Sequence, residues 1–144
     1  MQITSKFTVA IHTLLAIHTL GNEYKTTSEF IASSVNVNPV VIRRTLQSLK
    51  SAGLVEVKAG SGGARIIKDL KEITLYDVYV AMECLDGGLF HFHENPNPVC
   101  PVGKNIHFIL DQHLLNAQIS MENELKKVTI EDLVYNLNKI LNTE

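Results

Sequence analysis

The segment 38–54 carries basic and amide side chains on one side of a predicted helix and apolar side chains on the other. An arginine can bind guanine or a phosphate, a glutamine can pair with adenine, and a valine can contact a thymine methyl group. The first turn of a recognition helix enters the major groove, so we expect Val40, Arg43 and Arg44 to read base edges, with Gln47 beside them. The alternative is a solvated polar face. The inward-facing set is Ile42, Leu46 and Leu49.

A glycine-rich turn, Gly60–Gly63, offers a second contact with DNA. Residues 54–58 alternate as a strand, and residues 64–67 have the pattern of a returning strand. The glycines permit a tight turn and a close approach to a sugar-phosphate strand, while Arg65 could lie in the minor groove or against a phosphate. A nucleotide-binding loop is the alternative, but the Walker A pattern is missing and the turn joins two strands instead of opening a helix.

Cys100 is the candidate for thiol chemistry. It precedes Pro101, which fits the first position of a long predicted helix, so we expect Cys100 to be the N-cap residue. The positive end of a helix dipole favours thiolate, and thiolates react with oxidants. The sequence therefore predicts a redox-sensing thiol, with Cys84 as the resolving partner at a dimer interface. An inert small residue is the alternative.

These candidate residues need a scaffold, and the first 68 residues predict three helices followed by the two-stranded ribbon. Apolar residues at intervals of three and four predict the first helix over 3–20. Thr26–Glu29 has the pattern of a capping box, which opens a second helix running to Val35. Asn38 as N-cap and Pro39 at the first helical position open the third helix. This is the element order of a winged helix-turn-helix.

Three more helices are predicted in the second half. Thr74–Asp77 has a capping-box pattern that opens a helix to about Cys84, and Thr129–Asp132 has the same pattern before a last helix to about Leu141. A long helix is expected between them, from 101 to about 127. The fold class is therefore mostly α with a small β wing, a winged helix-turn-helix followed by a long dimerisation helix.

The long helix is apolar on two opposite faces. One face carries Val102, Ile106, Ile109, Leu110, Leu114, Ala117 and Met121, and the other carries Phe108, Leu115 and Ile119. A helix that is apolar on two sides is buried on two sides. We expect a second copy of the chain to cover the face of Phe108, Leu115 and Ile119. The alternative is that the chain's own helices cover both faces.

Charge divides the chain in two. Residues 1–68 carry eight lysines and arginines against three glutamates, a net +5, whereas residues 69–144 carry five bases and twelve acids, a net −7; together they give −2. A basic half joined to an acidic half is typical of a polyanion-binding module on a different kind of partner region. We therefore assign 1–71 to a DNA-binding domain and 72–144 to a helical dimerisation and sensor region.

Composition sets the remaining limits. With 144 residues and 45% hydrophobic residues, the chain can build a core. No apolar run reaches the roughly 18 residues needed to span a bilayer, and the N-terminal stretch does not have the form of a signal peptide. Two cysteines do not make a disulfide scaffold. We expect a cytoplasmic protein without a membrane partner.

Taken together, five segments resemble the Rrf2 (Rrf-two) family of bacterial winged-helix transcription regulators, nearly from end to end. The family includes regulators of iron–sulfur assembly, nitric-oxide response and cysteine metabolism. The segments are Ser5–Lys6, Asn38–Arg44, Leu49–Leu54, Gly60–Gly63 and Ile73–Val78. The resemblance implies a homodimer joined through the long helix on a dyad-symmetric operator of double-stranded DNA. It also implies that Lys6 and Thr8 contact the DNA backbone.

The expected function is thus a sequence-specific, homodimeric repressor controlled by oxidation of a cysteine. The full set of candidate DNA contacts is Lys6, Thr8, Thr27, Asn38, Val40, Arg43, Arg44, Gln47, Ser61, Gly62, Gly63 and Arg65. A winged-helix protein-interaction module without a DNA role is the alternative from another class. An enzyme is not expected, because no catalytic arrangement of serine, histidine, aspartate or cysteine is present.

Several members of the family hold an iron–sulfur cluster with three closely spaced cysteines. This chain has only Cys100 in the corresponding place, so we expect no metal and no cofactor. A metal- or cluster-sensing regulator stays open as an alternative, with His107, His91 and His93 as further ligands.

Overall fold

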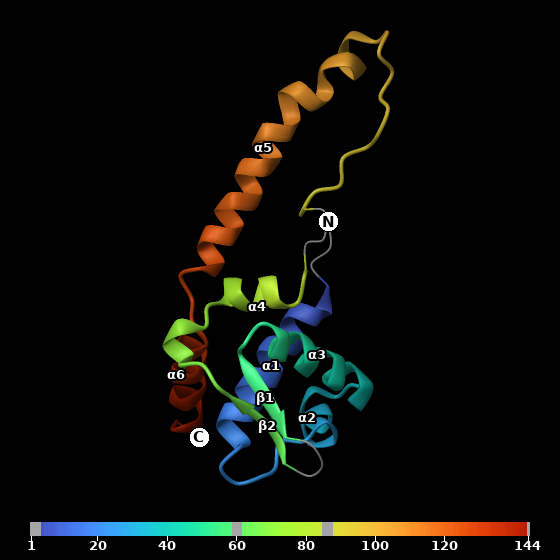
Figure 1. The fold of residues 1–144 in the computed structure, drawn as a ribbon. Helices are drawn as coiled ribbons and strands as arrows, with labels where there is room; N and C mark the ends of the chain where they lie inside the picture. The colour runs from blue at the N-terminus through green and yellow to red at the C-terminus, as the bar shows by residue number, and fades with distance from the viewer. Residues whose placement is uncertain (1–3, 59–61, 85–87, 144) are drawn as a thin grey trace.

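The computed structural model describes residues 4–58, 62–84 and 88–143, and its elements follow the predicted order (Figure 1). The helical chain with a two-stranded wing confirms the predicted fold class. The elements are α1 (Ser5–Leu20), α2 (Ser28–Val35), α3 (Pro39–Ser51), β1 (Val55–Lys58), β2 (Gly63–Ile66), a 3-10 turn η1 (Leu70–Glu72), α4 (Leu75–Ala81), α5 (Pro101–Leu125) and α6 (Ile130–Leu141).

Apolar side chains at helical spacing on α1, α2 and α3 meet in one core. Leu14, Ile31, Ile42 and Leu49 are completely buried, and Leu46 is nearly so. Burying such a side chain contributes about 1.5–3 kcal/mol. The predicted inward face of α3 is therefore confirmed, and its opposite face is left for binding.

The core continues beyond residue 71. Ile73, Val78 and Ile130 are completely buried in the same cluster as the helices of the first half. The backbone amide of Ile130 donates to the carbonyl of Ile73 at 2.8 Å, which ties the start of α6 to the segment before α4. The two regions assigned from the sequence thus share one core. We propose that they differ in function, with 1–71 binding DNA and 72–144 serving dimerisation and sensing.

Helix ends follow the predicted caps at three places. Oδ1 of Asn38 accepts from the amide of Val40 at 2.9 Å, with a proline at the first position of α3. Thr74 and Thr129 each form a complete capping box at the start of α4 and α6. These confirmed caps fix where α3, α4 and α6 begin.

The predicted capping box at Thr26–Glu29 is wrong. Thr27 is the N-cap of α2, and its Oγ1 accepts from the amide of Phe30 at 3.2 Å. Thr26 instead bonds to the wing: its Oγ1 donates to the carbonyl of Ala64 at 2.7 Å, and its carbonyl accepts from the Ala64 amide at 2.9 Å. A partner 38 positions away overrides the local pattern.

The wing is an antiparallel pair whose register runs from Val55↔Ile66 to Lys58↔Gly63. Gly63 adopts φ +74°, and a Cβ on it would lie 3.0 Å from backbone atoms of Thr26. Glycine is needed here for both the left-handed backbone and the close approach. The wing is therefore held against the connection between α1 and α2.

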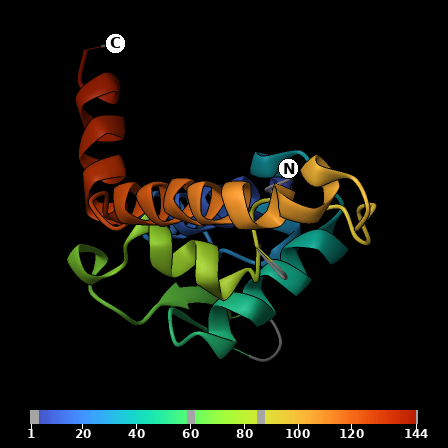
Figure 2. The same cartoon turned by 90° about the horizontal axis from the view of Figure 1, so that it is seen from above.

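The second half differs from expectation in the length of α4. The helix ends at Ala81 with Met82 as its C-cap, and Glu83 has φ +50°, so Cys84 lies beyond the helix and not on it. The described segment that begins at residue 88 runs outward to the start of α5 (Figure 1). Figure 1 shows α5 rising away from the N-terminal helices, and Figure 2 shows α6 turning away from α5 at a steep angle.

The helix α5 is an arm with little cover from its own chain. None of its residues is buried. Contacts with the chain come from α4, where the Tyr79 hydroxyl donates to Glu122 at 3.4 Å, and from the preceding loop, where the Leu89 amide donates to Gln118 at 3.0 Å. Within the described residues, no helix is both long enough and apolar enough to cross a membrane.

Candidate nucleic-acid interface

The outer face of α3 presents the side chains that the sequence assigned to base readout. Val40, Arg43, Arg44 and Gln47 are all exposed, whereas the opposite face of the helix is buried in the core. Lys50 in the last turn adds a third basic side chain, beside Arg43 and Arg44, to this face. The structure therefore brings the predicted α3 contacts together on one accessible surface.

Arg43 is held by a neighbour that the sequence did not suggest. Its Nη2 donates to Oε1 of Glu29 on α2 at 2.8 Å, and both side chains are more than half exposed. The pKa of Glu29 is lowered by a hydrogen bond from its own backbone amide and by the hydrogen bond from Arg43. The Glu29 carboxylate is thus charged at neutral pH, next to the exposed outer face of α3.

The wing places Arg65 on an exposed strand position. Arg65 lies opposite Glu56 in the register and forms an ion pair with it. Gly62 is exposed, so it stays a candidate for DNA contact, while Ser61 lies outside the described residues. Gly63 was predicted as a DNA contact, but it is buried against Thr26. We correct its role to shaping the wing.

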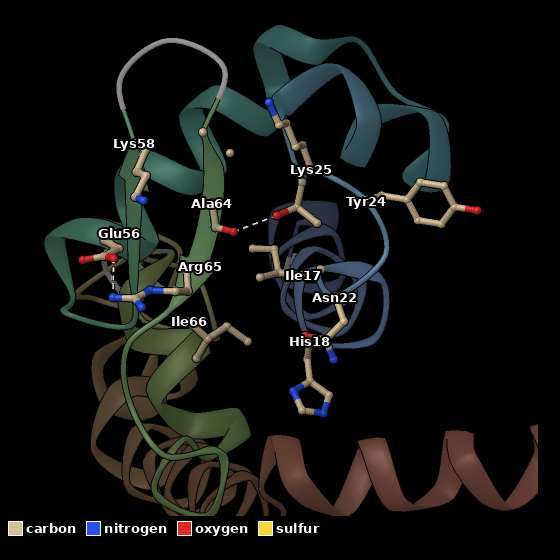
Figure 3. A pocket seen from close by; sticks show the side chains of 14 residues that line it. Ile17, His18, Asn22, Tyr24, Lys25, Glu56, Lys58, Ala64, Arg65 and Ile66 are labelled. Atoms are coloured by element: carbon tan, nitrogen blue, oxygen red, sulfur yellow. Dashed lines mark hydrogen bonds and ion pairs between the residues drawn. The ribbon is translucent and has the colours of Figure 1, made fainter.

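A cleft of about 430 Å³ lies beside the contact of Gly63 with Thr26, lined by the end of α1, the α1–α2 connection and both strands of the wing. Figure 3 shows Lys25 on the connection and Lys58 on β1, with His18 at the lower end of the cleft. None of these three was among the predicted contacts. The lysines entered the sequence argument only through the charge of the basic half, because their positions beside the wing depend on tertiary packing.

The remaining predicted contacts have other neighbours. Lys6 and Thr8 are exposed at the start of α1, where the Thr8 hydroxyl donates to the carbonyl of Ser5 at 3.1 Å. Thr27 and Asn38 each cap a helix, and a side-chain oxygen of each accepts a hydrogen bond from a backbone amide. Each cap engages one backbone amide of the first turn, and only the remaining free amides of that turn are available to an anion.

Cys100 is the N-cap residue of α5, as predicted. The backbone amides of Gly103 and Val102 lower the pKa of its thiol. Cys84 differs: it is half-buried against the core, and burial raises the pKa of its thiol, partly offset by the charge of Lys6. At a given pH, Cys100 therefore has a larger fraction of thiolate than Cys84.

Histidines gather near the start of α5. The rings of His93 and His107 have centroids 5.2 Å apart, and Nδ1 of His107 lies 3.2 Å from Oδ1 of Asp111. In the ranges 4–58, 62–84 and 88–143, however, no three histidine, cysteine or acidic side chains are arranged to hold a metal ion.

Both apolar faces of α5 are open. Phe108 is 88% exposed, Leu115 47% and Ile119 45% on the face predicted to dimerise. On the opposite face, Val102 and Ile109 are also exposed. The chain's own helices therefore do not bury either face, contrary to the alternative from the sequence, although Ile106, Leu114 and Met121 are half-buried.

Comparison with known proteins gives one consistent result. The family model Rrf2, described as an iron-dependent transcriptional regulator, matches residues 3–136. YwnA of Bacillus subtilis, named as a candidate HTH-type transcriptional regulator, is 45% identical over 136 residues, covering 94% of this chain and 99% of YwnA. YwgB of the same organism, named in the same way, is 37% identical over 58% of this chain and 54% of its own length.

Solved structures agree. One, described as a candidate DNA-binding protein, is 42% identical with a TM-score of 0.72, covering 90% of this chain and 98% of that chain. CymR, the global cysteine regulator of B. subtilis, has a TM-score of 0.66 at 19% identity, covering 94% of this chain and 97% of CymR. At that identity the likeness supports the fold alone.

Proposed function

The chain belongs to the Rrf2 family of transcriptional regulators, and we propose that it is a homodimeric repressor binding a dyad-symmetric operator. Its relatives are regulators and not enzymes, in agreement with the sequence. The observation that carries the proposal is α3, with a buried inner face and Val40, Arg43, Arg44 and Gln47 exposed outside. Repression requires only that the bound dimer blocks the promoter. Since the operator lies on the chromosome, we place the protein in the cytoplasm.

In this proposal the first turn of α3 enters the major groove and the wing follows the flanking backbone. Arg43 and Arg44 bind base edges or phosphates, and Gln47 lies one turn further along. Arg65 and Gly62 contact the flanking backbone or the minor groove, and Lys6, Thr8, Thr27 and Asn38 contact phosphates. The basic first half of the chain draws it to DNA despite the net charge of −2.

The test uses a duplex that the wild-type protein selects from random-sequence DNA. Replacing Arg43 or Arg44 by alanine is expected to weaken binding to this duplex by about 1–3 kcal/mol for a base contact. Fluorescence anisotropy measures the affinity. Lys139→Ala, which removes an exposed charge from α6, is the matched control and should bind as the wild type does. Wild-type affinity in both arginine variants would exclude α3 as the recognition helix.

Dimerisation through α5 is supported by the exposure of its apolar faces. A helix of 25 residues is about 37 Å long, and nothing in its own chain buries a residue of it. Apolar surface on such an arm is stabilised by pairing with a second copy, and a two-fold axis places the same face on both sides of the contact. Two such copies would present two α3 helices to two half-sites.

Sedimentation equilibrium tests the dimer. Phe108→Glu puts a charge into the proposed contact and is expected to give monomers at micromolar concentration, where the wild type sediments as a dimer. Tyr135→Glu is the control, since Tyr135 is 67% exposed but lies on α6. A wild-type protein that sediments as a monomer would contradict the dimer directly.

The family model is described as iron-dependent, which raises an iron–sulfur cluster as a candidate cofactor. A cluster needs three or four thiolate or imidazole ligands close together. The chain has two cysteines; Cys84 follows α4 and Cys100 is the N-cap of α5. Figure 1 shows α4 and the start of α5 far apart. The described residues contain no group of three suitable donors. These residues therefore do not fit an iron–sulfur cluster.

We propose instead that oxidation of Cys100 controls DNA binding. The Cys100 thiolate attacks a peroxide oxygen, which gives sulfenic acid at Cys100 and releases hydroxide. Its lowered pKa and partial exposure support this reaction. The Cys84 thiol of the second subunit would then displace the sulfenic oxygen, giving a disulfide and water.

DNA affinity before and after peroxide treatment tests the redox proposal. We expect the wild-type affinity to change on oxidation and to return on reduction, while Cys100→Ser stays constant. An unchanged wild-type affinity after complete oxidation of Cys100, verified by mass spectrometry, would exclude redox control. Either result of this redox experiment is compatible with the proposed DNA binding by α3.

A further inference from the structure

Glu29 lies beside the recognition helix without being part of it. It occupies the first turn of α2, and its Oε1 accepts a hydrogen bond of 2.8 Å from Nη2 of Arg43. The two side chains line a crevice of about 220 Å³ between the start of α2, α3 and the wing residues Val57 and Lys58. A charged carboxylate therefore stands inside a surface assigned to a polyanion.

The bond leaves most of the Arg43 guanidinium free. A guanidinium has five N–H donors in a rigid fork, and Glu29 is bonded through Nη2 alone. The remaining donors can still approach a base edge. Arg44, the adjacent arginine, forms no ion pair in the part of the chain that the structure describes. The two neighbouring arginines thus differ in how far they are fixed before DNA arrives.

We infer that Glu29 is a positioning residue that sets sequence specificity by fixing Arg43 for base readout and keeping it from phosphates. This inference rests on the proposed binding of α3 to an operator. On operator DNA, Arg43 contacts its base with the Glu29 bond intact. The conformational entropy of the Arg43 side chain is already lost in the free protein, so binding loses less of it. On other DNA, the Glu29 carboxylate repels phosphates and restrains the guanidinium next to it, so Arg43 gains little affinity from a phosphate.

A role of the Glu29–Arg43 ion pair in stability alone does not account for a carboxylate at this position. Exposed ion pairs contribute little to stability, and this pair is more than half exposed on both sides. The contact between α2 and α3 is already made by buried side chains such as Ile31 and Ile42. A carboxylate facing DNA also reduces affinity for phosphates, a cost that fixing the arginine can offset.

The experiment compares affinities for the duplex selected by the wild type and for a scrambled duplex of the same composition. We expect Glu29→Gln to lower the ratio of the two affinities by roughly two- to tenfold, the range for ordering one long side chain. Scrambled DNA should be bound more tightly, with a steeper dependence on salt, because Arg43 is free to take a phosphate. Thermal unfolding of the variant should match that of the wild type.

Two comparisons make the test specific. Glu56→Gln removes the same charge from a second exposed glutamate–arginine pair, on the wing, and should shift both affinities alike without changing their ratio. In an Arg43→Ala background, Glu29→Gln should leave the ratio unchanged, because the residue it positions is gone.

An unchanged ratio in Glu29→Gln would overturn the inference, and so would an equal drop in Glu56→Gln. Failure of the wild type to prefer the selected duplex would instead count against the proposed function itself. The two failures are therefore distinguishable within one set of measurements.

Discussion

Replacing Gly63 by alanine is expected to destabilise the protein more than the same change at Gly53. Both glycines have a left-handed backbone, with φ +74° at Gly63 and +77° at Gly53. Alanine in this region costs roughly 1–2 kcal/mol at either position. At Gly63 the new Cβ also lies 3.0 Å from backbone atoms of Thr26, whereas at Gly53 nothing lies within 4 Å.

The close contact at Gly63 displaces the wing from the α1–α2 connection. That shift weakens the two hydrogen bonds between Thr26 and Ala64, of 2.7 and 2.9 Å. Each such bond contributes about 0.5–1.5 kcal/mol, so the total loss for Gly63→Ala is roughly 2–5 kcal/mol if both bonds are lost. Gly53→Ala carries the backbone cost alone.

Urea unfolding of both variants at one protein concentration measures the difference, since the stability of an oligomer depends on concentration. The midpoint should fall further for Gly63→Ala, with unchanged slope. DNA affinity should fall as well for Gly63→Ala, because the wing is displaced. Equal losses of stability in the two variants would refute the reasoning that the wing is docked through Thr26.

Three further outcomes are expected. Iodoacetamide should modify Cys100 at lower pH than Cys84, because the amides at the start of α5 lower the thiol pKa of Cys100 and burial raises that of Cys84. Mass spectrometry across a pH series measures the modification of each cysteine, and the opposite order would show that the assignment is wrong. Ile42→Ala should cost about 2–5 kcal/mol in urea unfolding, since Ile42 is completely buried, and a loss below 1 kcal/mol would contradict the α3 orientation. Thr129→Ala should cost about 0.5–2 kcal/mol through its capping box, and a stability equal to wild type would show that α6 does not depend on this cap.

Features set by neighbouring residues could be predicted from the sequence. Asn38 with Pro39, and the threonines at 74 and 129, mark the starts of helices because each cap bonds within its own first turn. The inward face of α3 was also predictable, since the spacing of its apolar residues repeats with the helix. These local rules also placed Cys100 at the start of α5.

Features set by distant contacts were not predictable. Thr26 fits a local capping pattern, but its partner is Ala64 on the wing. Glu29 fits the same pattern, but it binds Arg43 on α3. The φ of +50° at Glu83, which separates Cys84 from α4, has no glycine or proline to indicate it. In each case the competing interaction joins segments that the sequence alone does not bring together.

The account depends most on sequence-specific DNA binding by α3 and the wing, which one titration tests directly. Wild-type affinity is measured for the selected and the scrambled duplex between about 50 and about 200 mM salt. We predict that the logarithm of the binding constant falls linearly with the logarithm of salt, by about 0.9 per phosphate contact, and that the selected duplex binds at least about 10³-fold more tightly. Equal affinity for the two duplexes, or an affinity that does not change with salt, would contradict it.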